Sequence, residues 1–363
     1  MGTLATRSRT AATINIVLWL LVAAVVGVVT DARTAGAATK WVDEDVSFPA
    51  GGLTVYATYR HPVDDTSRVG AVLLIAGSGP TDRNGNSTVE PGPINTLKTL
   101  ADWLSEDGVA SLRYDKLGSG RTGLGSYAND VEGIGVAPFE EESAAALKFL
   151  AAQKGVNDQR LGVFGHSEGA LFALLLATHH AGVVPPIHAL GLFEPLSLRY
   201  LDLITVQVDA QVQAQVKSGA ITKKLAKTVD TTLAHAVKQL RTKGTVASNL
   251  PYGLATLLSP ATAKFLSEAD KFDPESLAAS LPAGTPVLVS CSNADEQVSC
   301  AQVQRIVTGL ARAKADASFI QLEGVDHVLK VDPTGSAANY TKKLPFSPAL
   351  RAALKRFVDA SLK

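Results

Sequence analysis

The pattern of hydrophobic and polar positions divides the chain into short apolar runs and longer amphipathic stretches. Short apolar runs with little charge are typical of the buried strands of a parallel sheet. They predict strands at 71–75, 110–113, 161–164, 188–193, 286–290 and 317–322. Runs at 46–48 and 53–59, joined by Pro-Ala-Gly-Gly, predict a hairpin. Helical spacing predicts helices at 94–104, 140–152, 300–314 and 347–362, with loop between 117 and 138. Strands alternating with helices predict an α/β fold with a mostly parallel sheet and right-handed crossovers.

The strand pattern is interrupted between residues 197 and 283. This segment has amphipathic helical stretches at 200–216 and 221–240, followed by shorter helical pieces. Strand-like runs return only at 286. We therefore interpret 197–283 as a helical insertion between two parts of one sheet domain, residues 39–196 and 284–363.

The first 38 residues have the layout of a secretory signal peptide. Arg7 and Arg9 precede an apolar run at 16–29, and small residues follow, with cleavage expected after Ala37 or Ala38. The alternative is an uncleaved membrane anchor. The apolar run is shorter than the roughly 20 residues that a spanning helix needs, which favours export and cleavage.

Composition excludes some classes of function. The 363 residues carry no formal net charge, which argues against nucleic acid as a partner. The chain has neither a CxxC pair nor an HExxH motif, so we expect no metal site and no cofactor.

Cys291 and Cys300 are the two cysteines. In a reducing compartment they would be two buried thiols, whereas in an exported chain this pair predicts a disulfide.

The stretch Leu161–Leu175 carries the strongest chemical signal. An apolar strand run is followed by Gly165-His166-Ser167-Glu168-Gly169 and then by an Ala/Leu-rich helical run. Strand, G-x-S-x-G and helix in this order form a nucleophile elbow. The glycines let neighbouring backbone pass close to a sharp turn. The turn places Ser167 in a strained conformation at a helix N-terminus, where the dipole favours negative charge. Ser167 is therefore the candidate nucleophile.

A serine nucleophile needs a base within hydrogen-bond reach and an acid that orients the base. In the order Ser, acid, His that goes with this elbow, His327 follows the last predicted strand and is the candidate base. We interpret the other six histidines, including His166 in the elbow, as ordinary residues of loops and element ends. Asp295, in the loop after the strand at 286–290, is the candidate acid, and Glu194 after the preceding strand is the alternative. Asp326, beside His327, is interpreted as a loop-shaping residue.

The negative charge that develops during acyl transfer needs two preorganised donors. One expected donor is the backbone N–H of Glu168, the residue after the nucleophile. The other should come from the loop after the strand at 71–75. Ser78 is the predicted donor there, and Gly79 is the alternate.

Several of these stretches together carry a family resemblance. They are the loop GSGPTDRNGN at 77–86, with Asn84 where an acid is common, the stretch RYDK at 113–116, the GHSEG elbow, and the segments 293–298 and 326–330. The chain resembles the α/β-hydrolase-fold serine esterases, from about residue 45 to the C-terminus. Among these it is most similar to bacterial esterases and serine-aminopeptidase-like hydrolases that carry a GSGPTDRxGN loop. The leader and the cysteine pair depart from that group.

The resemblance implies hydrolysis of carboxylic esters through an acyl-enzyme, with the insertion at 197–283 forming a helical cap over the site. We therefore expect an exported serine hydrolase that acts on small-molecule esters, with membrane contact only through an uncleaved leader. A peptidase, thioesterase or acyltransferase would use the same three residues and stays open. A non-catalytic binding protein on this scaffold would lack one of them. We expect Leu254 and Leu257, on the apolar face of the insertion, to contribute to the acyl pocket.

Overall fold

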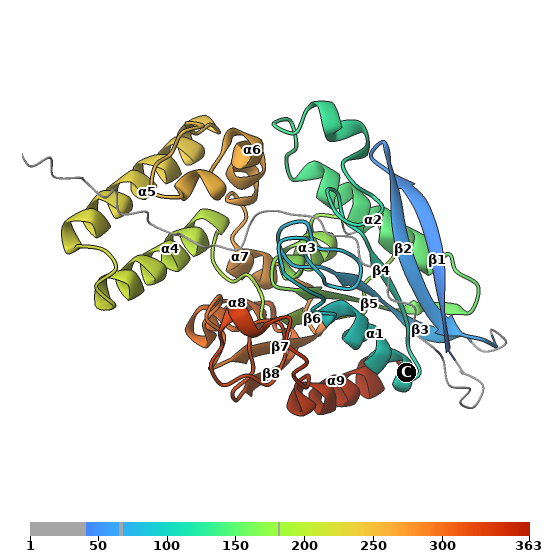
Figure 1. Ribbon diagram of the computed structural model, residues 1–363. Coiled ribbons are helices and arrows are strands. Elements are labelled where there is room, and N and C mark those ends of the chain that lie inside the picture. Colours follow the sequence, from blue (N-terminus) through green and yellow to red (C-terminus); the bar gives the residue numbers. More distant parts are fainter. Residues whose placement is uncertain (1–40, 65–67, 181) are drawn as a thin grey trace, which may run out of the picture.

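The computed structural model describes residues 41–64, 68–180 and 182–363 (Figure 1). The predicted signal peptide, residues 1–38, lies outside the described residues. Within the described part of the chain, none of the helices has both the length and the hydrophobicity needed to cross a bilayer.

An eight-stranded sheet forms the centre of the molecule, in the order β1-β2-β4-β3-β5-β6-β7-β8. The first two strands and the contact of β2 with β4 are antiparallel, and the other neighbours are parallel. The strands are β1 Trp41–Ala50, β2 Leu53–Pro62, β3 Val69–Ile75, β4 Ala110–Tyr114, β5 Val156–His166, β6 Ala189–Phe193, β7 Pro286–Ser292 and β8 Asp316–Leu322. The mostly parallel sheet agrees with the prediction from the alternating strand and helix pattern.

Both faces of the sheet are covered by helices, because successive side chains of a strand point to opposite faces. Leu73 and Val163 point to the face covered by α2 (Ala137–Ala151), α3 (Glu168–Thr178), α7 (Pro274–Ala279) and α8 (Cys300–Ala313). Leu74 and Phe164 point to the other face, covered by α1 (Thr96–Glu106) and α9 (Pro348–Ser361). Burial on both faces explains why these strands read as continuous apolar runs.

The inserted segment contains the helices α4 (Tyr200–Lys217), α5 (Lys223–Lys243) and α6 (Pro260–Ala269), which lie to one side of the sheet (Figure 1). They share a hydrophobic cluster of their own. Val208 and Val212 of α4 pack there with Leu233 and Leu240 of α5, at the spacing of one helix face. A short 3₁₀ helix at Leu254–Thr256 connects α5 to α6, and two others occur at Gly125–Asn129 and Ala337–Asn339.

Asp270 ties the inserted helices together where the segment rejoins the sheet domain. Its buried carboxylate accepts hydrogen bonds from the backbone N–H of Leu201 and from the guanidinium groups of Arg199 and Arg241. Three donors satisfy a carboxylate that burial alone would destabilise. The positions of α4 and α5 at this end are therefore coupled through one residue.

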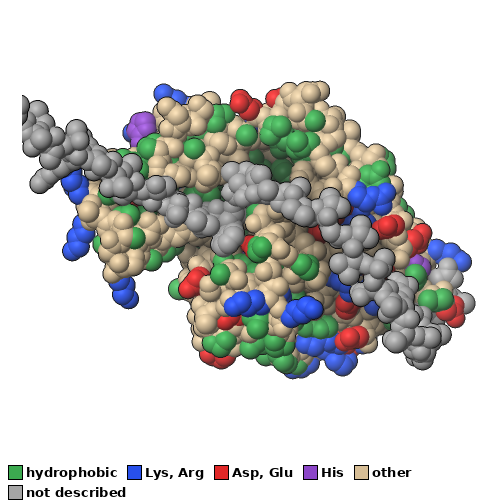
Figure 2. All heavy atoms as spheres, in the orientation of Figure 1, with side chains coloured by type: hydrophobic (Ala, Val, Ile, Leu, Met, Phe, Trp, Pro, Cys, Tyr) green, Lys and Arg blue, Asp and Glu red, His purple; other side chains and the backbone are tan. Residues whose placement is uncertain are grey.

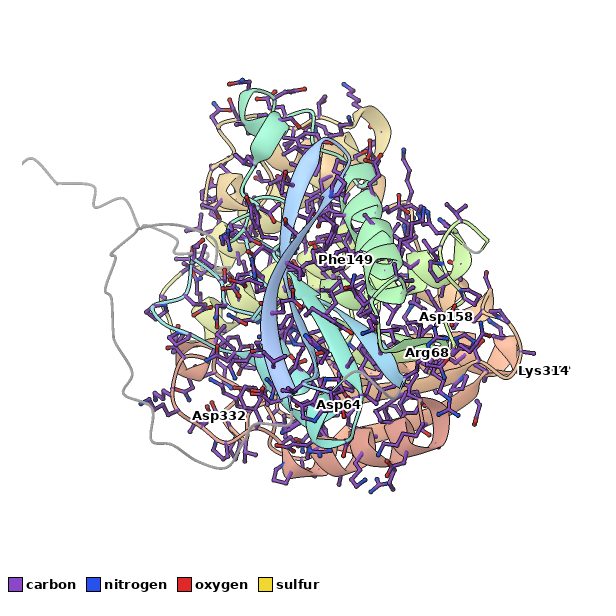
Figure 3. The ribbon with its side chains drawn as sticks, turned by 90° about the vertical axis from the view of Figure 1, so that its right-hand side faces the viewer. Asp64, Arg68, Phe149, Asp158, Lys314 and Asp332 are labelled. Atoms are coloured by element: carbon purple, nitrogen blue, oxygen red, sulfur yellow. A yellow bond between two sulfur atoms is a disulfide. The ribbon has the colours of Figure 1, made fainter. Side chains whose placement is uncertain are left out.

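The edge hairpin is longer than the sequence pattern predicts. Strand β1 pairs with β2 over its whole length, from Trp41 to Ala50, although the pattern indicated only 46–48. Most of β1 is exposed, so its polar residues give no alternation signal. Asp43 pairs instead with Arg60 of β2 at 3.1 Å. At the end near Ala50 the hairpin packs on α2, where Phe149 stacks on Phe48 with ring centroids 5.1 Å apart (Figure 3).

Helices α2 and α5 each extend beyond one of their predicted limits. Helix α2 begins at Ala137, so Pro138 belongs to its first turn, where the missing N–H costs nothing. Helix α5 extends beyond the predicted 240 to Lys243 and ends at Gly244, whose φ of 68° is the left-handed conformation of a helix C-terminus. The extension of α5 adds only polar residues, so the hydrophobic pattern did not mark it, whereas the extension of α2 adds Phe139, which packs against the core.

At the opposite end of the sheet from the predicted site, an ion pair connects two parallel strands. Arg68, just before β3, contacts Asp158 of β5 at 3.1 Å (Figure 3). Both side chains are largely exposed, so the pair contributes little stability. The candidate site residues follow the carboxyl ends of β3, β5, β7 and β8. They can lie close together because the carboxyl ends of parallel strands meet at one edge of the sheet.

Candidate active site

Ser167 occupies a tight turn between β5 and α3. Its φ of 55° and ψ of −119° are sparsely populated for a residue with a side chain. The turn is held by hydrogen bonds from the Ser167 N–H to the Phe193 carbonyl and from the Leu196 N–H to the Ser167 carbonyl, at 2.9 and 3.1 Å. Ser167 therefore has the strained conformation that the elbow motif predicts.

The two glycines of the motif are required by close backbone packing. A Cβ on Gly165 would lie 2.2 Å from the backbone of Gly169. A Cβ on Gly169 would lie 2.2 Å from the carbonyl oxygen of Ile75, in the neighbouring strand β3. Because both obstacles are backbone atoms, no side chain can be accommodated at either position. The elbow is thus packed directly against the loop that leaves β3.

His327 and Asp295 lie together although they are 32 residues apart. Nδ1 of His327 is 2.8 Å from Oδ2 of Asp295, and both residues are buried. The other carboxylate oxygen, Oδ1, accepts from the backbone N–H groups of Gln297 and Val298. Because the carboxylate only accepts, Nδ1 of His327 carries the proton in this contact and Nε2 is left as an acceptor.

His166 is a residue that the sequence interpretation passed over. Its Nε2 donates a hydrogen bond of 2.7 Å to the backbone carbonyl of His327, and the two rings lie 5.0 Å apart. Burial, and then the nearby His327, lowers the pKa of His166 to about 3. The ring therefore stays neutral and holds the backbone of His327 in place. Only its position inside the elbow could have drawn attention to it.

Asp326 shapes the turn that carries His327. Its Oδ1 accepts from the backbone N–H groups of Val328 and Lys330, at 3.1 and 2.8 Å. Burial raises the pKa of Asp326 to about 6, against the opposing effect of the hydrogen bond from Lys330. Oδ1 is thus bound by the residue's own loop, in agreement with a loop-shaping role, and the buried Oδ2 has no hydrogen-bond partner among the described residues.

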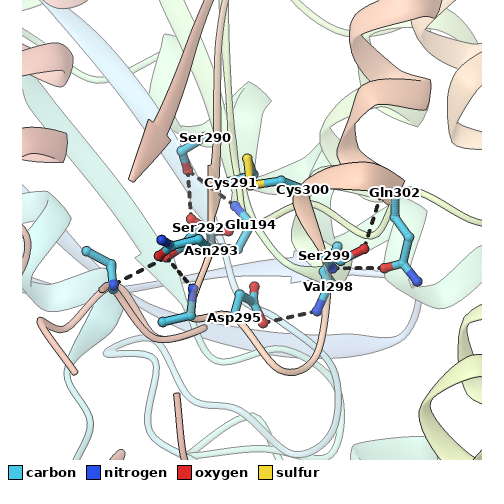
Figure 4. The surroundings of a disulfide bond; sticks show 12 residues. Glu194, Ser290, Cys291, Ser292, Asn293, Asp295, Val298, Ser299, Cys300 and Gln302 are labelled. Atoms are coloured by element: carbon cyan, nitrogen blue, oxygen red, sulfur yellow. Dashed lines mark hydrogen bonds between the residues drawn. A yellow bond between two sulfur atoms is a disulfide. The ribbon is translucent and has the colours of Figure 1, made fainter. Parts of the chain in front are cut away.

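Glu194, the alternative acid, lies next to Asp295 and is fully buried at a φ of 45°. Its Oε1 accepts from the hydroxyl of Ser290, and its Oε2 has no partner among the described residues (Figure 4). Burial, and then the charge of Asp295, raises the pKa of Glu194 well above its usual value. An ionised carboxylate with a buried, unpaired oxygen would be costly, so burial favours the protonated form of Glu194. The carboxyl group that contacts His327 is that of Asp295.

The predicted oxyanion donors border the same space as Ser167. The loop after β3 passes so close to the elbow that a Cβ on Gly77 would lie 3.3 Å from Cβ of Ser167. Ser78 and Gly79 line the cavity there, as does Glu168. Glu168 is the first residue of α3, so its backbone N–H has no acceptor within the helix. Their roles as donors remain predictions.

A buried ion pair fixes the far side of the loop after β3. The guanidinium of Arg83 contacts Asp115 at 2.8 Å, and the backbone N–H of Arg83 donates to the same carboxylate at 2.9 Å. Asp115 follows β4 and belongs to the RYDK stretch. Two motifs that carry the family resemblance are therefore in contact, and together they set the path of the loop.

A disulfide between Cys291 and Cys300 spans the loop that bears Asp295 (Figure 4). Cys291 is the second-last residue of strand β7, and Cys300 is the first residue of α8. The predicted bridge is thus present, and it closes a short ring around the candidate acid.

A cavity of about 1280 Å³ contains Ser167 and His327 in its wall. Its lining includes residues from α4, from α6 and from the loop between β4 and α2, and Figure 2 shows a hollow bordered by hydrophobic side chains between α6 and that loop. Leu257 lines the cavity, and its contribution to an acyl pocket stays a prediction. Leu254 does not line the cavity, because it is fully buried in the hydrophobic cluster of the inserted helices. Its assignment to the pocket was wrong, since the sequence pattern does not separate two apolar sides of one short segment.

Within the described residues, no group of three or more His, Cys, Asp or Glu side chains is arranged to hold a metal ion.

Comparison with known proteins supports the fold. No protein-family model matches the sequence, and no curated protein matches it significantly. Among solved structures, the Pyrococcus furiosus esterase Pf2001 matches with a TM-score of 0.52 and 15% identity, over 92% of this chain and 100% of that one. Est1E from Butyrivibrio proteoclasticus, with ferulic acid bound, matches with 0.53 and 17%, over 87% and 98%. Carboxyl esterase 2 (TmelEST2) from Tuber melanosporum matches with 0.53 and 14%, over 90% and 89%.

These identities establish the fold alone. The predicted α/β-hydrolase fold is confirmed, and the structures that share it here are esterases. The narrower resemblance, to hydrolases with a GSGPTDRxGN loop, stays a prediction.

Removing the disulfide is expected to loosen the loop that holds Asp295. In the loop-closure model, a ring of about ten residues stabilises the fold by roughly 2–3 kcal/mol. The double variant Cys291→Ala/Cys300→Ala should lower Tm accordingly. Amide hydrogen exchange should become faster at Gln297 and Val298, whose N–H groups bind Asp295. Unchanged exchange at these two amides would show that the bridge does not order the loop. Mass analysis of the unreduced protein after alkylation is the control, and two alkylated cysteines would contradict the bridge.

Proposed function

We propose that this protein is a serine hydrolase that cleaves carboxylic esters through an acyl-enzyme. The observation that carries the proposal is the buried contact between His327 and Asp295 in the wall of a cavity that also contains Ser167 in an elbow turn. The esterase neighbours support the same class of activity by fold. Nucleophile, base and acid are Ser167, His327 and Asp295.

The proposed reaction starts with attack of the Ser167 hydroxyl on the ester carbonyl while Nε2 of His327 takes the hydroxyl proton. Asp295 orients the ring and stabilises the imidazolium that forms. The carbonyl oxygen becomes an oxyanion that the backbone N–H groups of Glu168 and Ser78, with Gly79 as alternate, stabilise. Collapse expels the alcohol, which receives the proton from His327. A water molecule activated by the same imidazole then releases the acid and restores Ser167.

The cavity favours uncharged esters with apolar groups. Its walls include Ile94, Ile134, Leu203 and Phe265, and the segment 197–283 supplies α4 and α6 as a cap over the nucleophile. Lys116 is the lysine among the lining residues, and its ammonium is paired with Glu168 at 2.9 Å. No cation in the described lining is therefore available for a substrate carboxylate.

Export is part of the same proposal. The layout of residues 1–38 is that of a signal peptide, and the Cys291–Cys300 disulfide is compatible with an oxidising compartment. We therefore place the enzyme outside the cytosol, released or held at the cell envelope by an uncleaved leader.

Ser167→Ala should abolish turnover while leaving the fold intact. Loss of the nucleophile costs on the order of a million-fold in kcat in enzymes of this mechanism. The measurement is hydrolysis of p-nitrophenyl esters, with the circular dichroism spectrum and Tm as controls. A phosphonate directed at active-site serines should label the unchanged protein at Ser167 alone. Retention of more than a few per cent of the activity by the alanine variant would refute the mechanism.

The two neighbouring carboxyl groups should respond differently to conversion into amides. Asp295→Asn replaces the acceptor for Nδ1 of His327 and should lower kcat roughly ten-thousand-fold. Glu194→Gln resembles the protonated form that burial favours and should lower kcat by less than about tenfold. Both substitutions preserve side-chain volume, so each is the control for the other. The reverse ranking would make Glu194 the acid.

Substitution of Leu257 should change the selectivity for the acyl group, whereas substitution of Leu254 should lower the stability of the fold. Leu257→Ala enlarges the cavity and should change the kcat/KM ratio between octanoate and butyrate esters by about tenfold. Leu254→Ala, in the interior of the inserted helices, should lower the free energy of unfolding by about 2–5 kcal/mol and leave that ratio unchanged. Kinetics with p-nitrophenyl esters of graded length and urea denaturation of both variants provide the comparison. Equal ratios in the two variants would show that the cap does not select the acyl group.

A further inference from the structure

The RYDK stretch contains a buried lysine that the proposed chemistry does not use. Lys116 follows β4, and only 4% of its surface is exposed. Its ammonium donates to the backbone carbonyl of Gly77 and to Oε1 of Glu168, the latter at 2.9 Å. Burying an ammonium is costly unless its donors are satisfied. Both acceptors belong to the segments that supply the two predicted oxyanion donors.

The contact with Gly77 controls the direction of the next N–H group. The carbonyl of Gly77 and the N–H of Ser78 belong to one planar trans peptide, so they point in opposite directions. When Lys116 holds the carbonyl on one side, the N–H of Ser78 is directed to the other. Within the described part of the chain, that N–H donates to no protein acceptor. It is therefore available to a ligand in the cavity, where Ser78 and Ser167 both form part of the wall.

The contact with Glu168 fixes the other donor segment. Glu168 is the first residue of α3, and its carboxylate is buried. Oε1 accepts from Lys116, while Oε2 accepts from the hydroxyl of Tyr200 in the first turn of α4. Burial, and then the charge of Glu168, raises the pKa of Tyr200 well above its usual value, so the phenol remains a donor. The first turn of α3 is thereby tied both to β4 and to the inserted helices.

We propose that Lys116 is a positioning residue that aims the two backbone N–H groups of the oxyanion hole, by holding the Gly77 carbonyl and the Glu168 side chain with one ammonium. This inference rests on the proposed acyl-enzyme mechanism. Lys116 contacts neither the nucleophile nor the reacting carbonyl in this role. Its contribution appears when negative charge develops on the substrate oxygen, because fixed donors stabilise that charge more than they stabilise the ground state.

The main test removes both charges of the pair, so that no buried carboxylate is left without a partner. The variant Lys116→Met/Glu168→Gln keeps the backbone N–H at 168. A displacement of donors by about 1 Å costs on the order of 100-fold, so kcat on a p-nitrophenyl ester should fall about 100-fold with KM within about threefold. The inhibition constant of a phenyl trifluoromethyl ketone, which forms a tetrahedral adduct with serine, should rise by the same factor. The inhibition constant of the product acid should change less than about threefold.

A second ion pair, in which Asp107 is buried and Arg351 is partly exposed, provides the control. Arg351 contacts Asp107 at 2.6 Å and joins α9 to the end of α1, and neither residue lines the cavity. Arg351→Met/Asp107→Asn should lower Tm comparably and leave kcat and both inhibition constants within about twofold. Equal loss of kcat in the two double variants, or equal change of the ketone and product constants, would overturn the positioning role.

A milder variant decides the question if the double variant does not fold. Glu168→Gln alone retains Lys116 and its contact with Gly77, and it should raise the ketone constant about tenfold without changing the product constant. A ketone constant equal to that of the unchanged protein would overturn the proposal. The ketone also distinguishes this proposal from the mechanism itself. If the unchanged protein forms no adduct at Ser167, the acyl-enzyme mechanism is wrong, whereas a normal adduct in every Lys116 variant refutes only the role of Lys116.

Discussion

The packing of the elbow against β3 is the constraint on which the site depends. Gly169 touches the carbonyl of Ile75, and Gly165 touches Gly169, so strand, turn and helix are held at backbone contact distance. The strained φ of Ser167 is kept by hydrogen bonds to the segment that leaves β6. Strain of this kind persists only where the surroundings over-determine the backbone. Two neighbouring strands and one helix do so here.

The buried ionisable groups around the elbow differ in how well their partners stabilise a charge. Asp295 is supported by two backbone N–H groups and by His327, whereas Glu194 beside it has an unpaired oxygen and a pKa that burial raises well above its usual value. His166 is neutral because burial lowers its pKa to about 3. Asp295 is the carboxylate that directly contacts the ring of His327.

The inserted helices are connected to this centre by polar contacts as well as by the cavity wall. Tyr200 reaches the Glu168 carboxylate, and Asp270 binds α4 and α5 at the point where the segment rejoins the sheet domain. The hydrophobic cluster between α4 and α5 is separate from the two clusters on the faces of the sheet. A cap with its own core can differ in shape without disturbing the sheet, which suits a segment proposed to select the substrate.

The sequence by itself determined the strand and helix order and the elbow, because each depends on local signals, and it predicted the cysteine bridge on the condition that the chain is exported. Apolar runs indicate strands buried on both faces. The two glycines of the elbow motif indicate a turn in which close backbone packing leaves no room for a side chain. Residues without such a signal were placed less well. The predicted ranges of the exposed strand β1 and of helix α5 were too short. Leu254 was assigned to the cavity wall, whereas it lies in the hydrophobic cluster of the inserted helices. Only the tertiary structure decided which of two carboxyl groups meets His327, that His166 supports the backbone of that residue, and that Lys116 joins Gly77 to Glu168. These contacts join residues that are 32 to 161 positions apart in the sequence. The pKa values respond to burial and to neighbours that become known only when the chain is folded.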